Sequence, residues 1–238
     1  MSTGKKKIAV LTGAGVSAES GISTFRDNGG LWEQYDPEQV ASIRGWHADK
    51  ELMLDFYNRQ RIQLGQVRPN AAHLAIAGLE KEHDVTVITQ NIDNLHERAG
   101  STRIIHLHGE LTKVRPEQGI YDRTFSEEEV FDIGYTEIGL GDLAPNGSQL
   151  RPHIVWFGES VPMIEKAIDA VEAADILLIV GTSLQVYPAA GLYRYVRQGT
   201  PVYVIDPQDL TVRDSRLTHI RETATRGMET FCRILDRT

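Results

Sequence analysis

The sequence predicts an α/β protein with a Rossmann-like, doubly wound parallel sheet. Short β-branched runs recur along the chain, and each is followed by Gly, Asn, Asp or Pro. Patterns typical of helices separate several of these runs, and a glycine-rich turn follows the first one. Continuous apolar strands bounded by helices are typical of a parallel sheet that is covered on both faces.

The expected strands are residues 8–11, 85–89, 103–107, 176–180 and 202–205, and the expected helices are residues 50–64, 70–82, 163–174 and 189–198. Two segments do not fit this alternation: residues from about 34 to 65 are polar and helix-rich, and residues from about 110 to 151 are rich in glycine and charge. Because a long structureless loop is uncommon inside a compact domain, we expect both segments to pack together. We predict a Rossmann-like domain (1–33, 68–109 and 152–238) and a smaller, helix-rich inserted module (34–67 and 110–151).

Composition excludes several classes of function. The 238 residues carry 25 Lys and Arg against 33 Asp and Glu, a formal net charge of −8 that argues against direct nucleic-acid binding. No apolar run approaches the roughly 20 residues that span a bilayer, and the run after residues 5–7 is too short for a secretory signal. The only cysteine, Cys232, allows neither an intrachain disulfide nor a cysteine zinc site. We expect a cytoplasmic monomer without nucleic-acid or membrane partners.

The glycine-rich turn after the first strand matches the dinucleotide fingerprint at Gly13, Gly15 and Ala18. In that fingerprint the first glycine permits a tight turn, the second lets a pyrophosphate approach the backbone, and the small third residue lets the helix pack closely. The alternative is an ordinary strand-to-helix turn. An ordinary fingerprint continues to a second strand that ends in an acid, whereas residues 24–32 look like a loop, which disfavours a hydride-transfer dehydrogenase.

Three further polar clusters follow predicted strands. Gln90, Asn91 and Asp93 follow the second strand, His108 follows the third, and residues 181–183 follow the fourth. Each has a plain structural alternative, namely turn residues, a hydrogen-bonded structural histidine and a helix N-cap. Open α/β sheets bind ligands at the carboxyl ends of their strands, so the coincidence of the clusters at one edge favours a binding site.

Five motifs carry a family resemblance: GAGVSAESGISTFRDNGGLWE, TQNIDNLHERAGS, HLHGE, LRPHIVWFGESVP and GTSLQVYPAAGL. Together they resemble the sirtuins, which are NAD-dependent protein lysine deacylases. The motifs occur in the family's order and cover nearly the whole chain outside residues 110–150. The expected helix over residues 50–64, which contains Phe56 and Tyr57, and the segment after residue 110 are most similar to bacterial members of the branch that removes acidic acyl groups.

The resemblance implies a set of residues that bind NAD. They are Gly13, Ala14, Gly15, Glu19, Ser20, Gly21, Ile22, Thr24, Phe25, Arg26, Gln90, Asn91, Ile92, Asp93, Gly181, Thr182, Ser183, Asp206 and Ala224. Within this set, Phe25 would shield the ribose, and Ile92 with Asp93 would receive the nicotinamide carboxamide. The family more often has Asn at the position of Asp206.

The resemblance also implies the reaction. The acyl oxygen of the substrate attacks the ribose, nicotinamide leaves, and the products are free lysine and O-acyl-ADP-ribose. The catalytic residues would be His108, as general base toward the ribose hydroxyls, and Asn91. Acyl-lysine proteins or peptides would be held as an added strand by Val155, Phe157, Gly158 and residues 184–187. The alternatives are a protein mono-ADP-ribosyltransferase and a non-catalytic NAD or ADP-ribose sensor.

The chain departs from the family in two places. The cysteine pairs that hold a structural zinc are absent, so the module is expected to lack zinc and to be held by aromatic and aliphatic residues: Tyr121, Phe125, Val130, Phe131 and Tyr135. A replacement metal site at His106, His108 and Glu110 is disfavoured because His108 is needed as a free base. We therefore expect no metal and a structural role for His106.

The second departure concerns the acyl group. Family members that accept succinyl- and malonyl-lysine have a Tyr-x-x-Arg pair on a helix, and here Tyr57 is present but Gln60 stands at the arginine position. An amide brings no charge to a carboxylate. Arg61, one residue later and on nearly the same face, either takes over or is solvated. We predict that deacetylation is retained and that removal of acidic acyl groups is weaker.

Overall fold

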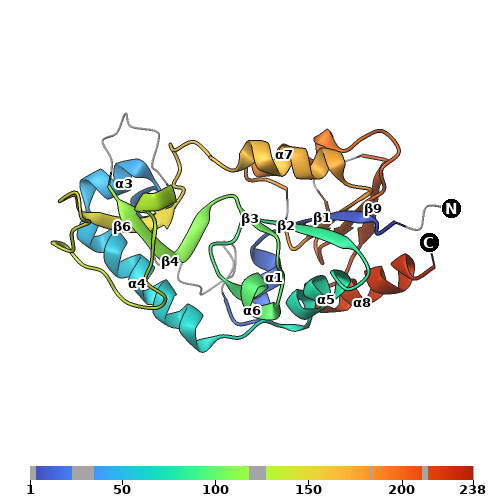
Figure 1. Cartoon of the computed structure of the whole chain (residues 1–238), viewed down its shortest axis with the longest axis horizontal. Helices are drawn as coiled ribbons and strands as arrows, with labels where there is room; N and C mark the ends of the chain where they lie inside the picture. The colour runs from blue at the N-terminus through green and yellow to red at the C-terminus, as the bar shows by residue number, and fades with distance from the viewer. Residues whose placement is uncertain (1–3, 23–34, 118–126, 183, 211–213, 238) are drawn as a thin grey trace.

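The computed structural model describes residues 4–22, 35–117, 127–182, 184–210 and 214–237. Its larger part is a six-stranded sheet, with the order β3-β2-β1-β7-β8-β9, in which every pairing is parallel (Figure 1). The strands are β1 (Lys7–Thr12), β2 (Asp84–Thr89), β3 (Ile104–His106), β7 (Ile176–Val180), β8 (Val202–Ile205) and β9 (Leu217–Ile220). The predicted doubly wound α/β fold is confirmed, and β9 is a strand that the sequence analysis missed.

Helices cover both faces of this sheet. Side chains of successive residues in β1 point to opposite faces, so Ile8 and Val10 join one buried core and Ala9 and Leu11 join the other. The first core packs against α5 (Ala71–Leu79) and α8 (Ala224–Leu235), and the second against α7 (Ile164–Ala173) and η3 (Ala189–Tyr195). Figure 1 shows α7 on one side of the sheet and α5 with α8 on the other.

One helix prediction needs correction, and one helix was missed. Residues 189–195 form a 3-10 helix instead of the expected α-helix; Gly191, which has low helix propensity, lies inside it. The amphipathic helix α8 was not predicted at all. Short helices α1 (Ala14–Ala18) and α6 (Leu95–Ala99) follow β1 and β2. No helix in the described ranges has both the length and the apolar character that crossing a membrane requires.

The smaller module combines helices with a sheet that the sequence did not predict. Its helices are α2 (Pro37–Val40), α3 (Ile43–Ala48) and α4 (Lys50–Gln66), followed later by the 3-10 turn η2 (Glu127–Glu129). A three-stranded antiparallel sheet, with the order β5-β4-β6, contacts α4; it is formed by β4 (Gly109–Pro116), β5 (Phe131–Asp132) and β6 (Leu150–Ile154). Residues 110–151, which the sequence analysis placed in the module without assigning any strand to them, thus supply most of this sheet.

A cluster of aromatic rings and an ion pair hold the module together. Trp156 packs on Trp46 with ring centroids 5.2 Å apart, and its indole N–H donates to the Tyr57 hydroxyl at 2.9 Å. The Arg151 guanidinium lies 3.4 Å from the centroid of the Trp156 ring. Glu159 accepts hydrogen bonds from Arg151 at 2.7 Å and from the Trp156 backbone N–H at 2.8 Å. Stacking, ion pairing and backbone capping therefore meet at Trp156.

The residues expected to replace the zinc site contribute unequally. Phe131 packs against the module's buried core, as predicted. Tyr135 is 41% exposed, although its hydroxyl accepts a hydrogen bond from Asn94, and Val130 is only half-buried. Tyr121 and Phe125 lie outside the described residues. The larger contribution comes from Trp156 and its neighbours, which the sequence analysis did not single out.

We predict that Trp156→Ala destabilises the protein by about 3–5 kcal/mol, because it removes a buried ring, leaves the Tyr57 hydroxyl without its donor and removes the ring on which the Arg151 guanidinium packs. Phe157→Ala is the matched control: the adjacent ring is 53% exposed, so its loss should change stability by no more than about 0.5 kcal/mol. Denaturant unfolding of the two variants measures both values. Equal losses would contradict this account of the module.

Candidate active site

Three loops meet at the carboxyl ends of β1, β2 and β7. The N–H groups of Gly13 and Gly15 donate to the carbonyl groups of Val180 and Gly181, at 3.1 and 2.9 Å, and the N–H of Gln90 donates to the Thr12 carbonyl at 2.9 Å. Strand β1 lies between β2 and β7, and the strand order continues through β2 to β3 on one side of β1 and through β7 to β8 and β9 on the other. This is the topological switch point, where open α/β sheets bind ligands.

The glycines of the fingerprint join two of these loops. A Cβ on Gly15 would lie 2.7 Å from the Gly181 Cα, and a Cβ on Gly181, whose φ is +62°, would lie 2.3 Å from the Val16 nitrogen. Gly13 has an ordinary extended φ of −129°, so its expected role in a tight turn is wrong; a Cβ there would contact Thr182 at 2.7 Å. Ala18 is exposed at the end of α1, so its expected close packing is also wrong.

The residues after α1 connect it to distant elements. The Glu19 carboxylate accepts hydrogen bonds from the Thr225 N–H at 3.0 Å and the Thr225 hydroxyl at 2.7 Å, at the start of α8. This contact brings Glu19 near Ala224, the first residue of that helix. The Ser20 hydroxyl accepts from the Asn70 side chain at 3.0 Å.

The remaining residues predicted to bind NAD lie around the same sheet edge or outside the described ranges. Gly21 has a φ of +90°, and Ile22 packs against the core of the smaller module. Asp206 follows β8, and one of its carboxylate oxygens accepts from the Gln208 N–H at 2.9 Å. Outside the described residues lie Thr24, Phe25, Arg26 and Ser183.

A buried polar network lies beneath the loop after β2. The Asp93 carboxylate accepts from the Ser17 hydroxyl at 2.8 Å and from the Leu95 N–H at 3.0 Å, and burial raises its pKa. Ser17 in turn accepts from the Asn91 side-chain amide at 3.1 Å, and His73 lies 3.4 Å from the same hydroxyl. Burial lowers the pKa of His73 to about 4, so this ring is neutral near pH 7. Ser17 therefore orients Asp93.

The sequence analysis missed Ser17 and His73 as part of this site. Ser17 lies inside the glycine-rich motif, which is a signal that could have been used. His73 is an isolated histidine on an otherwise apolar helix, and nothing in its local sequence separates it from an ordinary core histidine.

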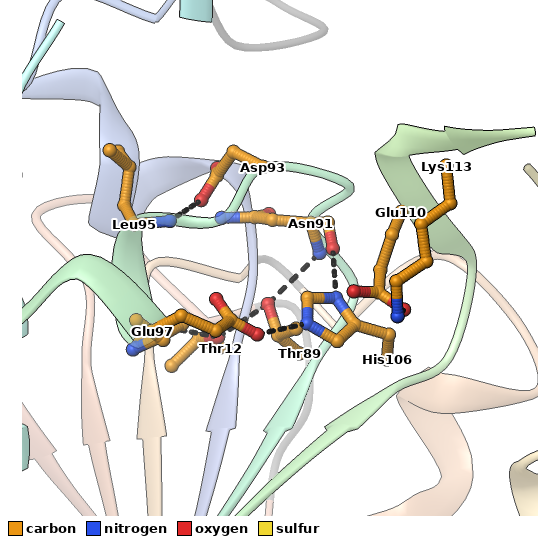
Figure 2. A network of polar contacts seen from close by, with 10 residues as sticks. Thr12, Thr89, Asn91, Asp93, Leu95, Glu97, His106, Glu110 and Lys113 are labelled. Carbon is orange, nitrogen blue, oxygen red and sulfur yellow. Dashed lines mark hydrogen bonds and ion pairs between the residues drawn. The ribbon is translucent and has the colours of Figure 1, made fainter. Parts of the chain in front are cut away.

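Two threonines support the same loop from below. The Thr12 hydroxyl donates to the Thr89 hydroxyl oxygen at 2.9 Å, and that oxygen accepts from the Asn91 N–H at 3.0 Å. His96 lies 3.1 Å from the Thr12 hydroxyl, and burial lowers the pKa of its ring to about 3. Figure 2 shows Thr12 and Thr89 side by side below Asn91. Nothing in the local sequence indicates that these hydroxyls and His96 interact.

His108 is oriented by the backbone of this loop. Its Nδ1 lies 2.9 Å from the Gln90 carbonyl oxygen, which can only accept, so Nδ1 carries the proton and Nε2 keeps its lone pair. Burial lowers the pKa of this half-buried ring, although the Gln90 carbonyl opposes the shift. The Gln90 side chain donates to the Thr182 hydroxyl at 3.1 Å. His108 is therefore neutral near pH 7 and can accept a proton at Nε2.

A strand-like segment runs beside His108. The Val155 N–H donates to the His108 carbonyl at 2.9 Å, and the Phe157 N–H donates to the Ala41 carbonyl at 2.8 Å. The Phe157 ring is exposed, and exposed Gly158 has a φ of +93°. On the segment after β7, Tyr187 is also exposed. The position of these side chains agrees with a peptide cleft, which stays a prediction.

Two of the three residues expected to select the acyl group are committed to contacts inside the module. Tyr57 is buried, its hydroxyl accepts from Trp156, and burial raises its pKa. Arg61 is also buried, donating to the Leu111 carbonyl at 2.8 Å and to the Asn58 side chain at 2.6 Å, and burial lowers its pKa to about 10. Gln60 is half-buried, and its amide nitrogen has no partner among the described residues.

One group of side chains in the described part of the chain has spacing suited to a metal ion: Glu97, His106 and Glu110, whose ligand atoms lie within 4.8 Å of one another. Its bonding does not fit a metal, because both nitrogens of His106 contact oxygen atoms and Glu110 is paired with Lys113 at 2.7 Å. This group also differs from the disfavoured metal site of the sequence analysis, since His108 is not part of it.

Comparison with known protein families identifies the family to which the fold belongs. The model of the Sir2 family matches residues 13–188. The chain belongs to the Sir2 family. A protein of Bacteroides thetaiotaomicron named NAD-dependent protein deacylase is 54% identical over 231 residues, which are 97% of this chain and 98% of that protein. A Helicobacter pylori protein of the same name is 49% identical over 225 residues, 94% of this chain and 93% of that protein.

Solved Sir2 structures have the same fold. A complex of a Sir2 homologue with NAD has a TM-score of 0.83 at 37% identity, covering 98% of this chain and 90% of that chain. A Sir2 complex with a deacetylated p53 peptide and 3′-O-acetyl ADP ribose has a TM-score of 0.79 at 28% identity, covering 97% of this chain and 92% of the other. The sirtuin resemblance found in the sequence is thus confirmed.

We predict that Gly181→Ala disrupts the site, because its methyl group would collide with the backbone of the loop after β1. Gly134→Ala is the control: its φ of +57° is close to the +62° of Gly181, but its Cβ would meet nothing within 4 Å. The control should cost about 1–2 kcal/mol of backbone strain alone. Thermal unfolding and NAD titration should show a larger stability loss and weaker NAD binding for Gly181→Ala only; similar behaviour of the two would contradict the close approach.

Proposed function

We propose that this Sir2 protein is an NAD-dependent protein lysine deacylase, which transfers the acyl group of an acyl-lysine to ADP-ribose and releases nicotinamide and O-acyl-ADP-ribose. The orientation of His108 carries the proposal. Its Nδ1 is fixed by the Gln90 carbonyl at 2.9 Å, so Nε2 is the basic nitrogen. A neutral imidazole at the switch point of an α/β sheet suits a general base near pH 7.

The chemistry of the residues at the switch point fits NAD. Gln90 and Asn91 offer amide groups and Thr182 a hydroxyl at one sheet edge, where nucleotide ribose and phosphate groups bind in open α/β sheets. We assign the nicotinamide carboxamide to Ile92 and Asp93, because Ser17 and the Leu95 N–H hold the Asp93 side chain in place. Bound NAD supplies an electrophilic ribose carbon with nicotinamide as its leaving group.

The chain's own residues then have separate tasks. In our proposal His108 accepts a proton at Nε2 from a ribose hydroxyl of NAD. Asn91, in the loop after β2, orients the same ribose. Residues 155–158 and 184–187 hold the acyl-lysine peptide between them by backbone pairing, which places few demands on its sequence. The exposed side chains of Phe157, Val186 and Tyr187 support this assignment.

The partners follow from the same chemistry. We propose acyl-lysine proteins or peptides as substrates and a monomeric enzyme that acts in the cytoplasm. The net charge of −8 argues against a direct nucleic-acid partner.

One experiment tests the proposed activity. Nicotinamide release from NAD is measured with one peptide that carries acetyl, succinyl, malonyl, butyryl or no acyl group on its lysine, and mass spectrometry identifies the products. Release that needs an acyl group, together with O-acyl-ADP-ribose, is the expected result. Release without acyl dependence would indicate ADP-ribosyl transfer, and NAD binding without release would indicate a sensor.

We predict that His108→Ala lowers acyl-dependent nicotinamide release by at least about 100-fold, since a general base contributes roughly 10²–10⁴-fold. NAD binding, measured by calorimetry, should persist because the loops that hold NAD are intact. His47→Ala, which removes an exposed histidine of α3, is the control and should keep full activity. Unchanged deacylation in His108→Ala would remove this residue from its assigned role.

The acyl preference follows from α4. Because Gln60 brings no charge and Arg61 is buried against Leu111 and Asn58, we propose that an acetyl group is removed more efficiently than a succinyl or malonyl group.

We predict that Gln60→Arg raises kcat/KM for the succinyl peptide relative to the acetyl peptide by about tenfold or more, because a hydrogen bond to a charged group contributes about 1.5–3 kcal/mol. Gln66→Arg adds the same charge at the exposed end of the same helix and should leave the ratio unchanged. The ratio is measured by competition between the two peptides. No gain for Gln60→Arg would refute the role of residue 60.

A further inference from the structure

A second histidine contacts the loop that orients His108. His106 ends β3, two residues before His108, and its Nδ1 lies 3.4 Å from the Asn91 carbonyl oxygen. The Nδ1 of His108 lies 2.9 Å from the carbonyl oxygen of Gln90, the preceding residue. Two histidines from one segment therefore hold consecutive carbonyl groups of the loop after β2.

The other nitrogen of His106 is bonded to a carboxylate. Its Nε2 lies 2.6 Å from Glu97 Oε1, on α6, and Figure 2 shows the ring between Glu97 and Asn91. Both partners are acceptors, so both ring nitrogens must carry a proton to make both contacts. Either neutral tautomer would turn a lone pair toward an oxygen atom. Only the imidazolium form satisfies the observed geometry.

The charges around the ring support this form. Burial lowers the pKa of His106, but the hydrogen bond and charge of Glu97, with Glu110 and the Asn91 carbonyl, raise it by more, so that it lies above its usual 6.5. Lys113, from the same strand as Glu110, is neutralised by that carboxylate.

The remaining titratable neighbours do not oppose the positive charge near pH 7. His96 on α6 and His153 on β6 interact with His106, but burial lowers their pKa values to about 3 and about 4, so both are neutral. Asp93 adjoins the loop and favours a positive ring by its charge.

Asn91 is the residue that this cation holds in place. Its N–H donates to the Thr89 hydroxyl at 3.0 Å, and its side-chain amide donates to the Gly13 carbonyl at 3.2 Å and the Ser17 hydroxyl at 3.1 Å. The contact with His106 is the fourth, and it holds the carbonyl oxygen. The contact is long, but the positive charge on the donor makes it stronger than a contact from a neutral ring would be.

We propose that the Glu97–His106 ion pair is a positioning device that fixes the Asn91 carbonyl and thereby the segment from Asn91 to Asp93. The inference rests on the proposed function, because that function places this segment against the ribose and nicotinamide. When His106 loses one proton, the hydrogen on Nε2 stays and keeps its bond to Glu97. Nδ1 is then the nitrogen without a hydrogen, and its lone pair repels the Asn91 carbonyl oxygen. Activity should therefore fall on the alkaline side of the His106 titration, whereas His108 sets the acid side.

The first test needs no activity. We expect ¹⁵N–¹H NMR spectra of the unliganded protein to give a His106 pKa above 6.5, with His106→Gln identifying its signals. In Glu97→Gln the pKa should fall by about one unit or more, because an adjacent opposite charge shifts a pKa by roughly 1–3 units. A His106 pKa at or below 6.5 in the unaltered protein would overturn the proposal, even if the variant failed to fold.

The second test is the pH profile of kcat/KM for NAD with the acetyl peptide. The unaltered enzyme should have an alkaline limb at the pH of the His106 titration. Glu97→Gln should retain activity near pH 7 and lose the limb, because the Gln amide can donate to Nε2 of the neutral ring and leave the Nδ1 hydrogen for Asn91. Glu110→Gln is the matched control: Glu110 lies beside the ring without bonding it, so its variant should keep the limb with a smaller shift.

The possible outcomes separate the two proposals. A limb that remains unchanged in Glu97→Gln, or a flat profile through the His106 titration, would overturn the positioning role. Absence of acyl-dependent nicotinamide release in the unaltered protein would instead overturn the proposed function, and the NMR titration would still decide whether the ion pair is charged.

Discussion

The close approach of the loops after β1 and β7 is the constraint on which the site depends. Gly15 and Gly181 meet with no room for a Cβ on either residue, and their backbones are joined by a hydrogen bond of 2.9 Å. This contact fixes where α1 begins, and Ser17 on α1 orients Asp93. The position of the buried carboxylate therefore follows from two residues that lack side chains. Of these two glycines, only Gly181 has a positive φ. Gly15 is therefore needed for the close contact between the loops and not for an unusual backbone conformation.

Two histidines two residues apart show how environment decides protonation. Burial lowers the pKa of His108, whose hydrogen-bond partner among the described residues is the backbone carbonyl of Gln90. His106 is half-buried as well, yet the Glu97 carboxylate reverses the direction of its pKa shift. For stability, the sign follows from linkage: the stabilisation by the His106 ion pair is complete below pH 6.5 and is lost as the pH rises through the raised pKa. The segment from His106 to His108 thus places a charged and a neutral imidazole ring against the adjacent carbonyl groups of Asn91 and Gln90.

The sequence was sufficient where local pattern determines structure. Five strands of the parallel sheet are runs rich in apolar and β-branched residues, and the loops after them carry Gln90 to Asp93 and His108, so the fold and the site edge could be predicted. Strand β9, which contains Thr218 and His219, has no such run and was missed. The sheet of the smaller module could not, because β4 and β6 pair across more than 30 intervening residues and carry buried Arg115 and Arg151. These arginines look like solvent-exposed residues until Glu159 is seen to pair with both. His106 likewise gained its role only when the fold placed Glu97 against it.

The segment around Trp156 links the stability of the module to the proposed peptide site. Glu159 pairs with Arg151 and also caps the Trp156 N–H, while the preceding residue, Val155, donates to the His108 carbonyl. The same short segment therefore anchors the aromatic core of the module and borders His108. Here the strand that we assign to peptide binding is itself part of what holds the module, so its geometry is tied to the Trp156 cluster.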